Sequence, residues 1–276
     1  MTYKIVSDSS SDVTEIEDIP FSSVPLKIHT KEREFTDTPD FDTNEMISYL
    51  ATYKGRSGSS CPNVREWTEA FGDADNVFCV ALTKNLSGSY SSACAAAAEY
   101  KSLNKGKNVH VFDTLSVGPE THLLIEKLRE EILRKKTFAD IVAACDEYIK
   151  KTRLFFSLKS LQTLANNGRA NPLVAKMASA LGIHAIGRAS DEGTLELTDK
   201  VRGEINSQKR IFDNMKSEGY LGGRVRIHHC QAKEQALSLL QRIKEAFPRS
   251  DVKISETRAL CSFYAERGGL LIGFET

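Results

Sequence analysis

The chain has 276 residues, of which 41% are apolar and 27% are charged, a composition typical of a soluble globular protein with one large or two smaller domains. Its 37 basic and 37 acidic residues give a formal net charge of zero and a pI of about 7.0. This balance argues against a nucleic-acid-binding protein, which would carry a basic surface.

The sequence shows no signal for export or for membrane insertion. The N-terminal residues lack the basic and apolar regions of a secretory signal, and no apolar run approaches the roughly 18 residues of a membrane-spanning helix. The six cysteines are scattered without a CxxC pair, a pattern typical of reduced cysteines and not of a disulfide framework or a zinc site. We therefore expect a cytoplasmic protein without a membrane span.

Strand and helix signals alternate through the first half of the chain. Short apolar runs typical of strands buried on both faces lie at residues 3–7, 76–82 and 108–112. Helical patterns lie at residues 89–100 and 121–136, and a further helix is expected to begin near Val64. In the second pattern, Ile125, Leu128 and Ile132 share one face. The alternation predicts a parallel sheet with right-handed crossovers.

The second half has a less regular order of elements. Strands are expected at residues 154–158, 224–230, 252–256 and 270–274, together with two strands within 183–199 that are joined by a turn at 191–193. Helices are expected at residues 159–167, from Pro172 to residue 181, at 201–215 and at 233–247. We therefore predict an N-terminal parallel α/β domain at residues 1–155 and a C-terminal α+β domain at residues 156–276.

Each of the three first-half strands ends in a polar loop of small residues. These loops lie at residues 7–12, 83–89 and 113–118, and a fourth polar loop lies at 55–63. Ligands bind outside the carboxyl ends of parallel strands, so we expect hydroxyls and the carboxylates of Asp8 and Asp113 to meet at one edge. Taken singly, Asp8 and Asp113 are typical turn formers, and Ser87 suits a helix N-cap. Their convergence favours a binding site.

The chemistry of this site is limited by the motifs that the sequence lacks. It contains no GxxxxGK[ST] phosphate loop, GxGxxG fingerprint, HExxH zinc motif or GxSxG elbow. Neutral hydroxyls and amides at a helix N-terminus suit an anion that is held and not attacked. The alternative is a hydrolase or phosphatase with Asp8, Asp113 or Ser87 as nucleophile, although no general base is paired with them. A third hypothesis is a regulatory module that senses its ligand.

In their order along the chain, the loops resemble the sequence blocks of the DegV family of bacterial fatty-acid-binding proteins. "KIVSDSSSDVT" resembles the family's first strand and Asp-Ser-x-x-Asp turn, and "SGSSCPNVREWTEAF" is similar to its Thr-Ser-Gln-Pro-Ser block. "VFCVALTKNLSGSYSSACAAA" resembles the Leu-Ser-Gly-Thr-Tyr block, and "VHVFDTLSVG" the Asp-Ser block. "SLKSLQTLANNGRA" is similar to the Leu-x-x-Leu and Gly-Gly-Arg block, and "LELTDKVRG" to the Lys-x-Arg segment. The resemblance spans nearly the whole length.

The resemblance implies a two-domain α/β protein that buries one long-chain fatty acid, such as palmitate, stearate or oleate, in an apolar tunnel between its domains. Relatives hand this acid to a fatty acid kinase, which phosphorylates the carboxyl group. By motif position, Ser59 and Ser87 would hold the carboxylate, with the Gly88 amide as a further donor and Ser60 as a neighbour. The implied protein is a carrier with no catalytic residue, cofactor or metal. Further positions near the site or facing the partner are Asp8, Asp113, Arg169, Arg202 and Tyr264.

The chain departs from the family's blocks at four places, one of which is residues 183–187, where relatives often have Ile-Lys-Pro-Ile. The Thr-Ser-Gln-Pro-Ser block reads Ser59–Asn63, which keeps the first hydroxyl and so preserves carboxylate binding. A His-x-Gly-Pro-Gly block near the C-terminus reads Tyr264–Gly268, so that a tyrosine replaces the histidine. The Gly-x-Gly sequence after the Asp-Ser block reads Glu120, Thr121 and His122.

Overall fold

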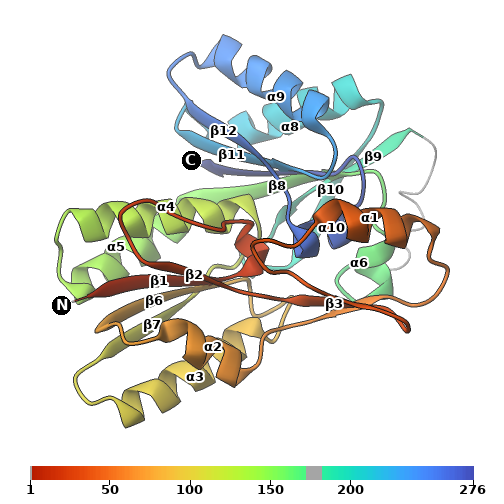
Figure 1. Ribbon diagram of the computed structural model, residues 1–276. Coiled ribbons are helices and arrows are strands. Elements are labelled where there is room, and N and C mark those ends of the chain that lie inside the picture. Colours follow the sequence, from red (N-terminus) through yellow and green to blue (C-terminus); the bar gives the residue numbers. More distant parts are fainter. Residues whose placement is uncertain (1, 172–181) are drawn as a thin grey trace.

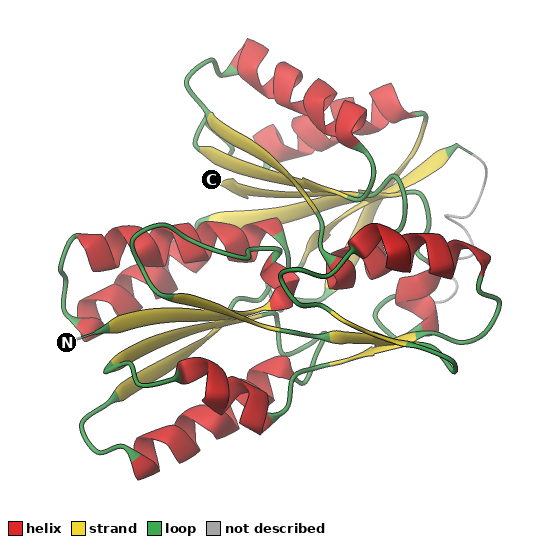
Figure 2. Ribbon diagram, viewed as in Figure 1, coloured by secondary structure: helices red, strands yellow, loops and turns green. Residues whose placement is uncertain are grey.

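The computed structural model describes residues 2–171 and 182–276, which form an N-terminal and a C-terminal half, each built on one main β-sheet (Figure 1). Helices and sheets alternate in layers, and one pair of helices lies between the two sheets (Figure 2). The expected α/β class with two sheet-based parts is therefore confirmed. The predicted helix from Pro172 to residue 181 lies outside the described residues.

The N-terminal sheet is parallel and has the strand order β2-β1-β6-β7. Its strands are β1 (Tyr3–Asp8), β2 (Phe21–Val24), β6 (Asn76–Ala81) and β7 (Asn108–Asp113). Helices α2 (Val64–Phe71) and α3 (Ser89–Leu103) cover one face, and α4 (Pro119–Leu133) and α5 (Phe138–Ile149) cover the other. The predicted parallel sheet and its predicted helices are confirmed, and β6 is buried along its whole length, as expected between two helix layers.

Local sequence explains where two of these helices begin. Asn63 and Glu66 form a capping box at the start of α2, in which each side chain accepts a hydrogen bond from the other residue's amide. Pro119 occupies the first turn of α4, where its missing amide hydrogen costs nothing. The preceding residue, Gly118, turns the chain into the helix with a φ of 66°.

The C-terminal sheet is mixed and has the strand order β10-β9-β8-β13-β11-β12, in which only β11 and β12 run parallel. Its strands are β8 (Thr152–Leu158), β9 (Ile183–Ala189), β10 (Leu195–Arg202), β11 (Arg224–His229), β12 (Asp251–Glu256) and β13 (Leu270–Glu275). Helices α8 (Glu204–Ser217) and α9 (Lys233–Ala246) cover its outer face. The mixed sheet agrees with the predicted α+β character of this half.

The predicted domain boundary at residue 155 falls inside β8, all of which pairs within the C-terminal sheet. We propose instead that the domains divide in the turn between α5 and Thr152. The division is incomplete, because α10 (Ala259–Ala265) returns from the C-terminal half and packs beside elements of the N-terminal half.

A small antiparallel sheet extends the N-terminal half and was not predicted. It has the order β4-β3-β5 and consists of β3 (Lys27–His29), β4 (Glu34–Thr36) and β5 (Gly58–Ser60). Helix α1 (Thr43–Thr52) and α10 pack against it, and α6 (Gln162–Asn166) lies nearby. Strands of three residues carry too little apolar periodicity to be recognised from sequence.

Helix α4 is shared by the two halves, because it packs on the N-terminal sheet with one face and on the C-terminal sheet with the other. Leu124, Ile125 and Leu128 belong to the core under the N-terminal sheet. On the other side, Gly273 of β13 lies so close that a β-carbon there would be 2.5 Å from the Glu120 amide nitrogen. The absence of a side chain at residue 273 therefore sets how closely helix and sheet approach.

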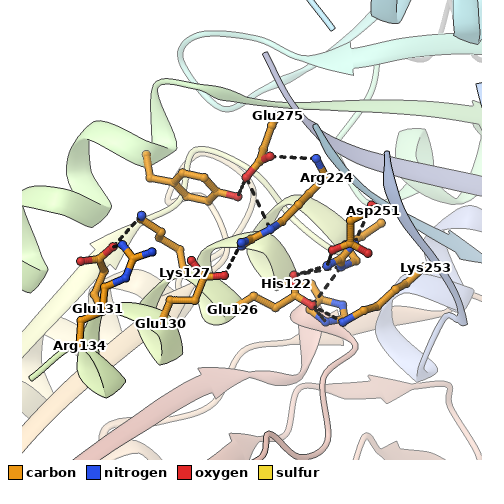
Figure 3. A network of polar contacts seen from close by, with 12 residues as sticks. His122, Glu126, Lys127, Glu130, Glu131, Arg134, Arg224, Asp251, Lys253 and Glu275 are labelled. Atoms are coloured by element: carbon orange, nitrogen blue, oxygen red, sulfur yellow. Dashed lines mark hydrogen bonds and ion pairs between the residues drawn. The ribbon is translucent and has the colours of Figure 1, made fainter. Parts of the chain in front are cut away.

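A network of charged side chains joins α4 to the edge of the C-terminal sheet (Figure 3). The Arg226 guanidinium, only 2% exposed, contacts the Glu126 carboxylate at 2.6 Å and the Asp251 carboxylate at 2.8 Å. Lys253 adds a contact of 3.0 Å to Glu126. Arg226 is buried and bonded to two carboxylates, and its contact with Glu126 links β11 to α4 across the two halves.

Two histidines continue the network into the interior. The Nδ1 atom of His122 lies 3.1 Å from Nε2 of His228, whose own Nδ1 lies 2.8 Å from the Asp12 carboxylate. Burial lowers the pKa of His122 well below its ordinary value, and the nearby His228, Arg226 and Lys253 lower it further. His122 is therefore neutral in the folded protein at neutral pH.

We predict that Gly273→Ala destabilises the protein by about 1–3 kcal/mol, because the added methyl group must push α4 away from β13. An alanine in a strand is otherwise favoured over glycine. A loss of stability on substitution would therefore show that residue 273 is in close contact with α4. Urea denaturation followed by circular dichroism measures it. An unchanged or higher midpoint would contradict the contact.

We predict that acid destabilises the protein through His122. Its pKa is 6.5 in the unfolded chain and lower in the folded one, so the unfolded state binds the proton first and stability falls as the pH drops below 6.5. Burial raises the pKa of Glu120 to about 7, which makes stability rise in the same window as the pH falls. The comparison of wild type with His122→Gln isolates the histidine. Parallel stability curves from pH 7 to pH 5 would contradict the prediction.

Candidate functional site

Asp8, the last residue of β1, connects the loops that follow β1 and β6. Its Oδ1 accepts hydrogen bonds from the Ser10 amide at 3.3 Å and the Ser10 hydroxyl at 2.5 Å. Its Oδ2 accepts from the Leu82 amide at 3.0 Å and the Ser89 hydroxyl at 2.7 Å. Burial raises the pKa of Asp8, and these hydrogen bonds oppose that rise. Asp8 is thus a buried anchor for the loops.

The loop after β7 joins the same edge of the sheet. The Thr83 amide donates to the Ser116 carbonyl at 2.9 Å, and the Gly118 amide donates to the Ser10 carbonyl at 2.9 Å. The three loops that follow β1, β6 and β7 are therefore bonded to one another. Their predicted convergence at the carboxyl ends of the strands is confirmed.

A cavity lies between these loops and the C-terminal sheet and, together with its opening to solvent, contains about 660 Å³ of space not filled by atoms. Its enclosed volume is only about 70 Å³, so the cavity is narrow. Of the seventeen described residues that line it, thirteen are apolar and come from both halves of the chain, namely Leu26, Leu82, Leu86, Val117, Leu154, Phe156, Leu158, Leu164, Leu195, Leu260, Cys261, Ala265 and Leu271. Its shape and lining suit a slender apolar molecule.

Four polar residues line the same cavity, namely Ser59, Ser87, Arg169 and Tyr264. The Ser59 hydroxyl lies 2.7 Å from the Tyr264 hydroxyl. The Ser87 hydroxyl accepts a hydrogen bond from the Ser89 amide at 3.2 Å, and within the described parts of the chain it donates none. The N-cap of α3 is Gly88, so Ser87 is not the N-cap that the sequence suggested. Its hydroxyl still has a hydrogen to offer to a ligand.

The Arg169 guanidinium supplies positive charge at the cavity wall. Its Nε donates to the Leu86 carbonyl at 3.1 Å, and its Nη1 donates to the Asn167 carbonyl. In residues 2–171 and 182–276, no carboxylate forms an ion pair with it. A guanidinium bonded to carbonyls, without a carboxylate partner, favours the binding of an anion.

The other predicted site residues do not line the cavity. Ser60 is exposed and points away from it, since side chains alternate along β5. Gly88 is exposed at the N-cap of α3, and Arg202 is exposed at the far end of β10 from Leu195. Asp113 accepts hydrogen bonds from the amides that follow β6 and β7 and pairs with a lysine. Sequence position had grouped these residues with the site because it cannot show which way a side chain points.

Helix α10 contributes wall residues that sequence analysis did not find. Leu260, Cys261, Tyr264 and Ala265 of this helix all line the cavity. Only Tyr264 was singled out, from its place in a family block. Helix α10 spans seven residues and is buried almost throughout, so it shows no amphipathic periodicity that could have revealed it.

Among the described residues, no group of three or more His, Cys, Asp or Glu side chains could hold a metal ion. No helix in the described ranges is long and apolar enough to cross a membrane.

Comparison with known proteins matches residues 2–276 to a family model described as uncharacterised protein, DegV family. A DegV domain-containing protein of Streptococcus pneumoniae strain R6 is 38% identical over 279 residues, which cover 100% of this chain and 99% of that protein. A solved DegV family protein from Eubacterium eligens, loaded with heptadecanoic acid, is 41% identical, with a TM-score of 0.98 and 100% coverage of both chains.

A second solved structure, the Streptococcus pneumoniae fatty acid kinase (Fak) B3 protein loaded with linoleic acid, is 38% identical, with a TM-score of 0.98 and coverage of 100% of this chain and 99% of that one. Both the whole-length family match and these relatives agree with the order of sequence blocks. The chain therefore belongs to the DegV family.

Proposed function

We propose that this protein binds one long-chain fatty acid in the cavity between its two halves. The observation that carries the proposal is a narrow apolar cavity with two serine hydroxyls and an arginine without a carboxylate partner among its lining residues. The solved relatives at 41% and 38% identity are described as loaded with heptadecanoic and linoleic acid, which are ligands of this class. Ser59 and Ser87 are the proposed carboxylate donors.

The balance of energies supports this ligand. Each buried methylene group of an acyl chain contributes roughly 0.8 kcal/mol, so a long chain supplies most of the affinity. A buried carboxylate is costly unless it is hydrogen-bonded. Charge-assisted hydrogen bonds from Ser87 and Ser59, and the positive charge of Arg169, offset that cost and fix the orientation of the chain.

The same geometry weighs against an enzyme at this edge. Asp8 is 1% exposed, and both of its carboxylate oxygens accept hydrogen bonds, so it cannot reach a substrate as a nucleophile. Ser87 lines the cavity, but no histidine or carboxylate lines it with Ser87 among the described residues. A hydroxyl without a general base is a poor nucleophile and a good hydrogen-bond donor. We therefore propose a carrier without catalysis of its own.

We propose further that the protein presents its fatty acid to a fatty acid kinase, since one relative at 38% identity is described as a fatty acid kinase B protein. The exposed Ser60, Gly88 and Arg202 lie outside the cavity and are candidates for contact with that partner. All six cysteines are free, which fits the proposed cytoplasmic location.

We predict that Ser87→Ala weakens oleate binding about 10- to 100-fold, the effect of removing a hydrogen bond to a charged group. Ser60→Ala is the matched control, because Ser60 is exposed and does not line the cavity. Isothermal titration of delipidated wild-type protein and both variants measures the affinities. A wild type that takes up no fatty acid contradicts the proposed function, whereas equal affinities for all three proteins remove Ser87 from the carboxylate site.

We predict that the oleate-loaded protein, mixed with a bacterial fatty acid kinase and ATP, yields acyl phosphate. Free oleate at the same concentration is the control and should react more slowly, because the kinase would act on the carboxyl group that the protein presents. Hydroxylamine trapping of the acyl phosphate measures the product. Tight oleate binding with no acyl phosphate would instead favour a module that senses fatty acid.

A further inference from the structure

The turn between β9 and β10, residues Ser190–Thr194, contacts the loops at the carboxyl ends of β6 and β7. We call these five residues the β9–β10 turn. A β-carbon on Gly193 would lie 2.3 Å from the Thr83 hydroxyl oxygen and 2.9 Å from the Leu115 α-carbon. The turn thus reaches from the C-terminal sheet into the N-terminal half and fits there only because residue 193 lacks a side chain.

Thr83, which the β9–β10 turn contacts, lies in the segment of the chain that immediately precedes Ser87. Thr83 is fully buried, and its carbonyl accepts from the Leu86 amide at 3.1 Å, which closes a tight turn before Ser87. Asn85 lies in this tight turn before Ser87, and its side-chain amide donates to the Glu192 carbonyl of the β9–β10 turn at 2.5 Å. The segment before Ser87 is therefore held by the C-terminal half at two points.

A third contact holds the end of this segment. Arg169, also from the C-terminal half, donates to the Leu86 carbonyl at 3.1 Å. Thr83, Asn85 and Leu86 are thus each in contact with the other half of the chain. Ser87 follows immediately, so its position depends on these contacts.

The β9–β10 turn is closed by its own hydrogen bonds. The Ser190 amide donates to the Thr194 carbonyl at 2.8 Å, and the Gly193 amide donates to the Ser190 carbonyl at 2.9 Å. The hydroxyls of Ser190 and Thr194 lie 2.9 Å apart. Gly193 has a φ of 78°, a conformation that suits glycine. A turn closed by its own hydrogen bonds can hold a neighbouring loop in place.

We propose that the β9–β10 turn, through Gly193 and the Glu192 carbonyl, positions the Ser87 loop and thereby controls how long a bound fatty acid stays in the cavity. The turn also leads into Leu195, which lines the cavity wall. Gly193 and Glu192 are positioning residues, since neither lines the cavity. This inference rests on the proposed role of Ser87 in fatty acid binding.

Gly193→Ala tests the proposal, and Gly106→Ala is the matched control. Both glycines have left-handed backbones, with φ of 78° and 88°, so alanine imposes a similar backbone cost at either position. Nothing lies within 4 Å of a β-carbon at residue 106, whereas one at residue 193 meets Thr83 and Leu115. Only the first substitution can displace the turn from the Ser87 loop.

The measurement is the rate at which a fluorescent polyunsaturated fatty acid leaves the protein when excess oleate displaces it. We expect Gly193→Ala to raise this rate at least about tenfold, as expected for changes that act mainly on dissociation, and Gly106→Ala to leave it within about twofold of wild type. Thermal unfolding of both variants checks that alanine lowers the stability through its backbone conformation by a similar amount at residues 193 and 106. Equal rates for the two variants overturn the proposal, while a wild type that binds no probe contradicts the proposed function itself.

Asn85→Ala provides a second test that does not depend on the glycine backbone. Asn85 is exposed, and its substitution removes the hydrogen bond to Glu192 without opening the core. We expect a rise of about two- to fivefold in the dissociation rate with an unchanged melting temperature. If Gly193→Ala does not fold, the proposal is tested by Asn85→Ala alone. A dissociation rate equal to that of wild type then overturns the proposal.

Discussion

The packing of α4 between two sheets is the constraint on which the rest of this structure depends. A helix that buries one face in each sheet fixes the distance between them, and Gly273 makes the distance short on the C-terminal side. The charged network around Arg226 and the histidine chain stabilise the same contact. Because α4 follows β7 directly, this packing places the carboxyl ends of the parallel strands against the C-terminal sheet, and the cavity forms there.

Some residues around the cavity determine its shape, and others would contact a ligand. Asp8 lies behind the cavity wall and joins the loops through four hydrogen bonds. Its buried carboxylate therefore positions the loops and does not contact a ligand. Ser59 reaches the cavity from β5 and Ser87 from the loop after β6. Each is joined to the C-terminal half, Ser59 through Tyr264 and the Ser87 loop through Arg169. Binding at the polar end therefore depends on both halves.

The sequence predicted the parallel sheet, the α+β character of the second half and the meeting of three loops, because long apolar periodicity and strand-end polarity are local properties. It did not predict β3 to β5 or α10, whose stability comes from distant contacts. The Ser59–Tyr264 contact joins residues 205 positions apart. For the same reason the sequence could not separate Ser59 from its neighbour Ser60, or show that Arg202 is exposed and outside the cavity.

The most direct test of the account is a crystal structure of the protein loaded with oleate. We expect continuous ligand density along the apolar cavity, with the carboxylate within hydrogen-bonding distance of the Ser87 and Ser59 hydroxyls and the acyl chain against Leu154 and Phe156. Density for the acyl chain elsewhere, or a carboxylate at the opposite end of the cavity, would contradict it.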